Sequence, residues 1–549
     1  MNGPIVLSCR VWARPGCRDG LRDYEDRVLA LLTEHDGRLL VRTYGHGAGP
    51  DEGHLIRFAS ETAKQGWLDD PRRTALQALR EDVLESCEVH PVELVPPETV
   101  PAPPAGTDRL SERDARVIAG VEKLRFFPLE VVSGYGAVLY DPEGRSMLDF
   151  SASWTASGLG HGDAGVRAAV DWALREPPGA SLLSAVSPEP VALAEELIAM
   201  IPIRSEDARV YLGHAGTDAN DVAVRACRHA TGRPRMLAFR HGYHGGLGTA
   251  QAVSGVHVEA GVPADPHTVF LPYPDPLRPD ASGAASRADL VEHVLGLVDA
   301  ELAGGDVAGV IVEPIQSDGG LVVPPPGFLP GLREACDRHG TLLVLDEVKV
   351  GMGRTGRLLA HQHEGITADL VSLGKALGGG LPLSALVGPA SALVEPTATA
   401  LLTTVGNPAC CAAARTVLAR LRESTLVADA AARGCQLVTG LQGYAASARP
   451  GARHVGEVRG RGLCVGVELV DSPQTLVPAD RLTAKVAYRA WQLGLVCYPV
   501  RGNVLELTPP LVVTAEQIAA GATLLGRAID DVVSGLVPDE TVAAFSGWA

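Results

Sequence analysis

The sequence has few of the features that mark secreted, membrane-bound or metal-binding proteins. Its 549 residues include only ten cysteines, which are scattered without a Cys-x-x-Cys pair, so we expect no disulfide framework. No apolar run approaches the ~20 residues that cross a bilayer, and no basic-then-apolar leader opens the chain. These absences predict a cytoplasmic protein.

Positive charge is also scarce. The chain has 48 Lys and Arg residues against 65 Asp and Glu residues, a net charge of −17, which argues against nucleic acid or an anionic membrane as a partner. Two histidine pairs, His241 with His244 and His361 with His363, lack a convincing third ligand. We therefore predict no metal site.

An acid and an amine follow two short apolar segments in the second half of the chain. Residues 342–345 and 370–373 are predicted to be buried strands, and they end at Asp346-Glu347 and Gly374-Lys375. Ligands bind outside the carboxyl ends of parallel strands. A buried ion pair is the simpler explanation, but the glycines at 378–380 allow a ligand to approach the backbone closely. We therefore favour a ligand site.

Lys375 and Asp346 are the two groups that pyridoxal phosphate requires of a protein. A lysine amine forms a Schiff base with an aldehyde, and a carboxylate keeps a pyridine nitrogen protonated so that the ring accepts electrons. The stretches 345–356 and 373–382, which contain these residues, resemble the signature of class III, or omega-type, aminotransferases. The resemblance extends over residues 124–525.

This resemblance implies a fold type I enzyme of the α/β class, with a mostly parallel seven-stranded sheet in a large domain and a smaller α+β domain. It implies a homodimer with shared active sites that moves an amino group between a small amine or amino acid and a carbonyl acceptor. A racemase, epimerase or aminomutase on the same scaffold is the alternative, because it would use the same two residues. A non-catalytic assembly protein is disfavoured by the retained lysine, acid and phosphate loop.

A glycine turn and a helix start follow the predicted strand at 209–212. Free amides and the positive end of the helix dipole at such a turn attract an anion. The resemblance assigns the phosphate contacts to Gly216 and Thr217. Asp218 stands where relatives more often carry glutamate.

The resemblance also implies contacts to the cofactor outside that loop. Tyr243 would stack on its ring, Glu313 and Gln316 would lie beside it with Gln316 near the phenolic oxygen, and Thr403, with Thr404 as the fallback, would reach the phosphate of the neighbouring subunit. Trp154 falls in the segment that lines the substrate entrance, although a core position would explain a tryptophan equally well.

Glu506 is a departure from the family. Many relatives carry an arginine there that grips the carboxylate of glutamate or 2-oxoglutarate, and a carboxylate in its place repels that group. Two hypotheses follow. Either Glu506 points away and is solvated, or Glu313 and Glu506 together favour a cationic or polyol amine.

Residues 1–96 lie outside this resemblance and have the predicted order strand, helix, two strands, helix, strand of a ferredoxin-like unit. The unit resembles dimeric α+β-barrel domains, and we expect it to serve oligomerisation or docking rather than a second active site. A proline-rich linker at 97–107 follows. We divide the remainder into small-domain residues 108–165, a cofactor-binding large domain at 166–410 and a C-terminal small domain at 411–549. The strands expected in the first unit are 5–12, 39–44, 55–58 and 89–95.

Overall fold

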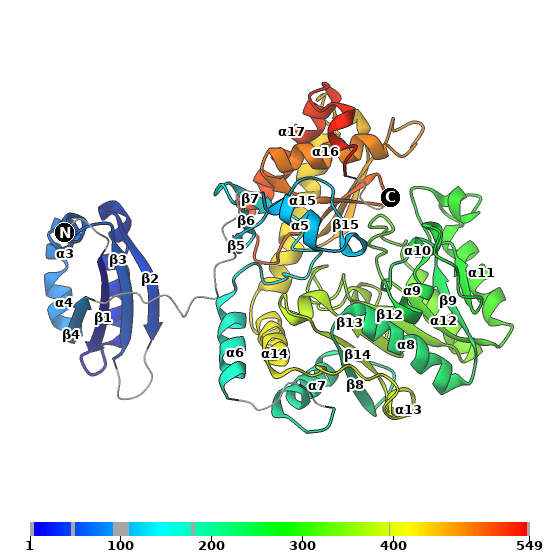
Figure 1. Cartoon of the computed structure of the whole chain (residues 1–549), viewed down its shortest axis with the longest axis horizontal. Helices are drawn as coiled ribbons and strands as arrows, with labels where there is room; N and C mark the ends of the chain where they lie inside the picture. Colours follow the sequence, from blue (N-terminus) through cyan, green and yellow to red (C-terminus); the bar gives the residue numbers. More distant parts are fainter. Residues whose placement is uncertain are drawn as a thin grey trace. The chain divides into compact units, whose positions relative to one another are not determined.

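The computed structural model describes residues 5–44, 50–91, 109–176, 181, 183–394 and 396–545. Its contacts divide the chain into two compact units, residues 1–109 and 110–549 (Figure 1). The predicted linker at 97–107 lies outside the described residues. The further division of the second unit at residues 165 and 410 stays a prediction.

The first unit is a four-stranded antiparallel sheet with short helices. Its strands lie in the order β2-β3-β1-β4, and the elements follow one another as predicted except that the second helical segment is split into three. Side chains along β3 alternate between buried and more exposed positions, which is typical of a sheet with one covered face. The elements are β1 (Ile5–Ala13), α1 (Arg18–Leu29), β2 (Gly37–Tyr44), β3 (Glu52–Phe58), α2 (Glu61–Leu68), α3 (Pro71–Ala75), α4 (Gln77–Val83) and β4 (Leu84–Pro91).

The last strand of this unit differs from the prediction. β4 begins at Leu84 rather than at residue 89, because α4 ends at Val83 and Leu84 already has an extended backbone. No loop separates the two elements. Residues 92–95 of the predicted strand lie outside the described residues, and the resemblance to dimeric α+β-barrel domains stays a prediction.

A seven-stranded sheet forms the centre of the second unit, as the resemblance implied. Its order is β10-β9-β11-β12-β13-β14-β8, and β14 runs antiparallel to the other six strands of this sheet. The strands are β8 (Ala208–Gly213), β9 (Arg235–Phe239), β10 (Thr268–Leu271), β11 (Val307–Val312), β12 (Leu342–Asp346), β13 (Leu370–Leu373) and β14 (Ser384–Pro389).

Both faces of this sheet are covered. Along β11, Val310 and Val312 pack in one core cluster, whereas Ala308 and Ile311 pack in another. A strand that is buried on both faces needs a continuous apolar run rather than an alternating one. The described helices of this unit are α5 (Leu110–Val117), α6 (Ala164–Arg175), α7 (Pro188–Met200), α8 (Gly216–Thr231), α9 (Gly248–Ala252), α10 (Gly255–Glu259), α11 (Leu290–Leu302), α12 (Phe328–His339), α13 (Ala390–Leu393), α14 (Pro408–Glu423), α15 (Leu426–Ala445), α16 (Asp480–Gln492) and α17 (Ala515–Val533).

Two smaller sheets complete the second unit. One has the order β15-β16-β19-β18, and the other joins distant parts of the chain in the order β17-β7-β6-β5, with β7 parallel to β17. Among the described helices, none is long and apolar enough to cross a membrane. The strands are β5 (Ser133–Tyr135), β6 (Val138–Tyr140), β7 (Ser146–Asp149), β15 (Val455–Arg461), β16 (Cys464–Leu469), β17 (Leu495–Val496), β18 (Tyr498–Val500) and β19 (Val504–Leu507).

Candidate active site

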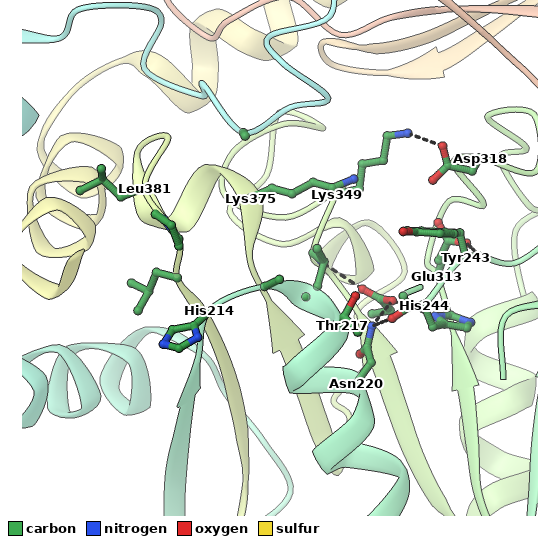
Figure 2. A pocket seen from close by; sticks show the side chains of 18 of the residues that line it. His214, Thr217, Asn220, Tyr243, His244, Glu313, Asp318, Lys349, Lys375 and Leu381 are labelled. Carbon is green, nitrogen blue, oxygen red and sulfur yellow. Dashed lines mark hydrogen bonds and ion pairs between the residues drawn. The ribbon is translucent and has the colours of Figure 1, made fainter. Parts of the chain in front are cut away.

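A cavity of about 360 Å³ lies where β12 and β13 end and α8 begins (Figure 2). Six of the ten predicted site residues line it, and the other four do not. The six are Gly216, Thr217, Tyr243, Glu313, Asp346 and Lys375. The large sheet therefore brings the predicted acid, amine and helix start to one place.

Asp346, at the end of β12, is held by three donors. Its Oδ2 accepts hydrogen bonds from Asn220 Nδ2 and from His244 Nδ1, each at 2.7 Å, and its Oδ1 accepts one from the Val348 amide at 3.0 Å. The side chain of Asn220 also donates to the His244 carbonyl at 2.8 Å. This network fixes the direction of a carboxylate that is 4% exposed.

Lys375 follows β13 and begins a short 3₁₀ turn with a φ of 45°. Its side chain points into the cavity, toward Asp318 and Tyr243 (Figure 2). Burial and the neighbouring Lys349 ammonium lower the pKa of Lys375. Among the described residues, none forms a hydrogen bond or ion pair with its amine. A lysine with a lowered pKa and no competing partner is suited to react with a carbonyl.

The start of α8 has the geometry of an anion site. Asp218 Oδ2 accepts from the amides of His214 at 2.7 Å and Ala215 at 2.9 Å, which leaves the amides of Gly216 and Thr217 at the cavity without an acceptor within the described parts of the chain. A Cβ on Gly216 would lie 2.6 Å from Val348 Cγ1. Glycine is therefore required at this position, and the helix dipole favours an anion beside it.

Tyr243 and Glu313 form the opposite wall of the cavity. The Tyr243 amide donates to Glu313 Oε1 and the Ser317 amide donates to Glu313 Oε2, each at 3.0 Å. Burial raises the pKa of Glu313 to about 7. The Tyr243 ring lies across the cavity from Lys375 (Figure 2), and its stacking on a cofactor stays a prediction.

Two predicted contacts lie outside the cavity lining. Gln316 is buried and its Nε2 donates to the Arg240 carbonyl at 2.8 Å. Thr403 is exposed, whereas the fallback residue, Thr404, forms a 3.1 Å hydrogen bond through Oγ1 with Nε2 of His214, which lines the cavity. The roles predicted for Gln316 and Thr403 stay predictions.

The contacts of Trp154 have features of both alternatives, a core position and a position near the substrate entrance. Its ring packs on Tyr498 with centroids 4.9 Å apart, as a core residue would. The Lys349 ammonium lies 5.2 Å from the centre of the same ring, and Lys349 lines the cavity. Trp154 therefore supports the cavity wall from behind without lining it.

The solvated alternative for Glu506 is wrong. Its side chain is 3% exposed, because every position of β19 is buried. Glu506 Oε2 lies 2.7 Å from Lys349 Nζ, and Oε1 accepts from Thr508 Oγ1 at 3.1 Å. The carboxylate is thus held by a buried ammonium, and Glu313 is not among its bonded partners.

Sequence reasoning missed Lys349 and Asp318, which line the cavity. Lys349 Nζ forms ion pairs with Asp318 Oδ1 at 3.1 Å and with Glu506 Oε2 at 2.7 Å, and we call these three residues the 318–349–506 triad. Burial alone would lower the pKa of Lys349, but the two carboxylates outweigh it and raise that pKa. The signal available in the sequence was a lysine, Lys349, between two apolar residues, Val348 and Val350, shortly after Asp346.

These residues fit pyridoxal phosphate. The start of α8, where Gly216 packs against Val348, suits the phosphate. The Asp346 carboxylate, which accepts three hydrogen bonds, suits the pyridine nitrogen. The Lys375 amine, which has no polar partner among the described residues, suits the aldehyde. The sheet order and this set of residues define a fold type I enzyme that depends on pyridoxal phosphate.

Comparisons with known proteins agree with this assignment. The pattern of the family Aminotransferase class-III matches residues 119–529. The chain is 33% identical over 448 residues to leucine/methionine racemase of Thermococcus litoralis, which spans 80% of this chain and 99% of that one. It is 36% identical over 410 residues to acetylornithine aminotransferase of Mycobacterium tuberculosis H37Rv, which spans 73% and 93%.

The solved structures give the same result. An amine transaminase from an uncultivated Pseudomonas species, in a form with bound pyridoxal phosphate, is 28% identical with a TM-score of 0.67 over 79% of this chain and 99% of that one. The chain belongs to the class-III aminotransferase family, and its cofactor is pyridoxal 5′-phosphate. The match begins at residue 119, so the first unit lies outside it.

Proposed function

We propose that the enzyme transfers an amino group between a small amine or amino acid and a carbonyl acceptor. The observation that supports this most is the Lys375 amine, which has a lowered pKa, has no polar partner in the described part of the chain, and lies in the same cavity as the fixed carboxylate of Asp346. Bound pyridoxal phosphate supplies an electron sink that makes a proton on the donor's α-carbon acidic.

The residues then have separate tasks. Asp346 would accept a hydrogen bond from the pyridine nitrogen of the cofactor and so keep it protonated, and Lys375 Nζ would take the proton from the donor's α-carbon as a general base. The amides of Gly216 and Thr217 would bind the phosphate and so orient the α-carbon toward Lys375. Tyr243 closes the far wall of the cavity and limits access of water.

The lining also bears on the acceptor. No arginine lies among the described residues that line the cavity, and Glu506 is committed to Lys349. A second carboxylate on the acceptor would therefore meet Glu313, Asp318 and an ammonium, Lys349, that two carboxylates already hold, without a guanidinium to pair with. We propose a monocarboxylic oxo acid, aldehyde or ketone as the acceptor rather than 2-oxoglutarate.

A specific observation favours a second candidate, the racemisation or epimerisation of an amino acid. Lys375 and Asp318 enter the cavity from opposite sides (Figure 2). Inversion requires removal of the α-proton on one face and return of a proton on the other. The Asp318 carboxylate, whose pKa is lowered by Lys349, would take the proton on one face, and the ammonium form of Lys375 would return one on the other. Racemases also occur among the relatives.

One experiment separates the two candidates. The purified enzyme is given single amino acids without an acceptor, in deuterated water. Conversion of the cofactor to its amine form supports transamination, whereas deuterium at an inverted α-carbon with the cofactor unchanged supports racemisation. Lys375→Ala should abolish both reactions, and Asp318→Asn should abolish inversion while transamination survives. Retention of both activities by Lys375→Ala would refute the proposal.

A further inference from the structure

The first unit contains a cavity that the proposed enzyme reaction does not use. It has a volume of about 700 Å³ and lies between the sheet and the helices of that unit. We propose that it is a binding site for a small organic anion with a flat apolar body, whose charged group pairs with Arg73. This proposal does not depend on the function of the second unit.

The walls of the cavity are apolar and come from several elements. Alternate residues of β1 contribute Leu7 and Val11, β3 contributes Ile56, and α1 contributes Val28. These side chains are buried. Protein interiors are close-packed and contain few voids larger than a water molecule, whereas ligand sites occupy roughly 300 to 1,000 Å³. The volume is therefore that of a ligand site and not of a packing gap.

Arg73 supplies the positive charge. Its guanidinium lies 3.7 Å from the centre of the Trp67 ring, and Nη1 donates to the Trp67 carbonyl at 3.3 Å. Burial lowers the pKa of Arg73, and it forms no ion pair with any described carboxylate. The adjacent Arg72 differs, because it pairs with both Glu34 and Asp70. A half-buried guanidinium that is oriented by stacking, and that forms no ion pair within the described ranges, is suited to bind an anion.

The charged side chains of the lining leave an excess of positive charge. Lys64 is paired with Glu61, and Arg80 has no carboxylate partner among the described residues. Glu25 lies 3.6 Å from His54 Nδ1 and attracts Arg73 without forming an ion pair with it, so Arg73 and Arg80 together outnumber this carboxylate. The cavity therefore favours an anion over a cation.

The cavity is accessible along its β4 side. Every residue of β4 after Leu84 is exposed, and the rim residues Val89 and Leu68 are 49% and 43% exposed. Leu68 and Val89 also line the cavity, so they continue its apolar walls to the surface, and a contiguous apolar surface of this kind marks a binding site. The rim and the walls therefore match the apolar body of the proposed ligand.

Two fluorescent dyes test the proposal on the full-length enzyme. Anilinonaphthalene sulfonate has a flat apolar body with one negative charge, and phenylnaphthylamine has the same body without the charge. We expect the sulfonate to bind about tenfold more tightly, the effect of a charge-assisted pair. Arg73→Met should remove this preference and leave the affinity for the neutral dye unchanged, and Arg73→Lys should retain part of it.

Two further variants provide the controls. Arg57→Met removes an exposed arginine of β3 outside the cavity lining and should keep the preference. Val28→Phe fills the cavity and should weaken both dyes. The proposal is overturned if Arg73→Met keeps the preference or if Val28→Phe leaves both affinities unchanged.

If circular dichroism shows that Arg73→Met is unfolded, Arg80→Met takes its place. Arg80 is the other cation of the lining without an ion pair among the described residues, and the proposal then stands only if Arg80→Met lowers the preference for the sulfonate.

Discussion

The two lysines of the cavity are in opposite states. Burial and a neighbouring cation lower the pKa of Lys375, which has no polar partner among the described residues. Asp318 and Glu506 raise the pKa of Lys349 against the effect of burial. The difference teaches that partners, not burial, decide which of two buried lysines is suited to act as a nucleophile and which is a fixed cation.

We expect that Lys349 cannot replace Lys375. Lys375→Ala should lower kcat/KM by about 10,000-fold, the upper end of what a general acid and base contributes, because the Lys349 ammonium is held by two carboxylates. Steady-state kinetics with the best donor would measure this. Lys485→Ala, which removes a lysine paired with Asp539 elsewhere in the second unit, should retain full activity. A Lys375→Ala enzyme with a tenth of the wild-type activity would contradict the comparison.

Removing the fixed cation should affect stability more than binding. Lys349→Met leaves Asp318 and Glu506 buried without a counterion, which should lower the free energy of unfolding by about 3 to 5 kcal/mol. Urea denaturation would measure this loss. The double variant Lys349→Met/Glu506→Gln removes one of the two orphaned acids and should recover part of it. Equal stability of the two variants would show that the triad is not held by charge.

Sequence reasoning located Asp346 and Lys375 but not the 318–349–506 triad. Asp346 and Lys375 follow apolar strands that neighbour each other in the sheet, so a local pattern and one topological rule place them together. Glu506 lies 157 residues from Lys349, and no local pattern pairs residues that far apart. A glutamate between Leu505 and Leu507 left a solvated position open as one of two alternatives, but both faces of β19 are covered. The boundary of β4 was misplaced because a helix runs directly into it.

The same rule applies to the acids of the cavity, and Glu313 is its sharpest test. Glu313 has no ion-pair partner among the described residues, and burial raises its pKa from 4.5 to about 7. The protonated form therefore stabilises the folded state in full below pH 4.5, and this contribution is lost as the pH rises through 7.

Glu313→Gln should remove that pH dependence. Between pH 4.5 and 7 the unfolding free energy of the wild type should fall, relative to the variant, by up to about 3 kcal/mol. Urea midpoints of both proteins at pH 5 and pH 7.5 would measure the difference. A parallel pH dependence of the two proteins would mean that Glu313 has an ordinary pKa.

The smallest effect concerns the influence of the triad on Lys375. Glu506 raises the pKa of Lys375 and Lys349 lowers it, so Glu506→Gln and Lys349→Met should move that pKa in opposite directions. Because Lys375 acts as a base in its neutral form, Glu506→Gln should shift the acidic limb of the kcat profile to lower pH, and Lys349→Met should shift it to higher pH.

Glu506→Gln should itself cost only about 1 kcal/mol of stability, since the amide oxygen can still accept from Lys349 and Asp318 still compensates the ammonium. A role limited to packing would change stability without moving the limb. Shifts in the same direction for both variants would show that Lys375 is not coupled by charge to the 318–349–506 triad.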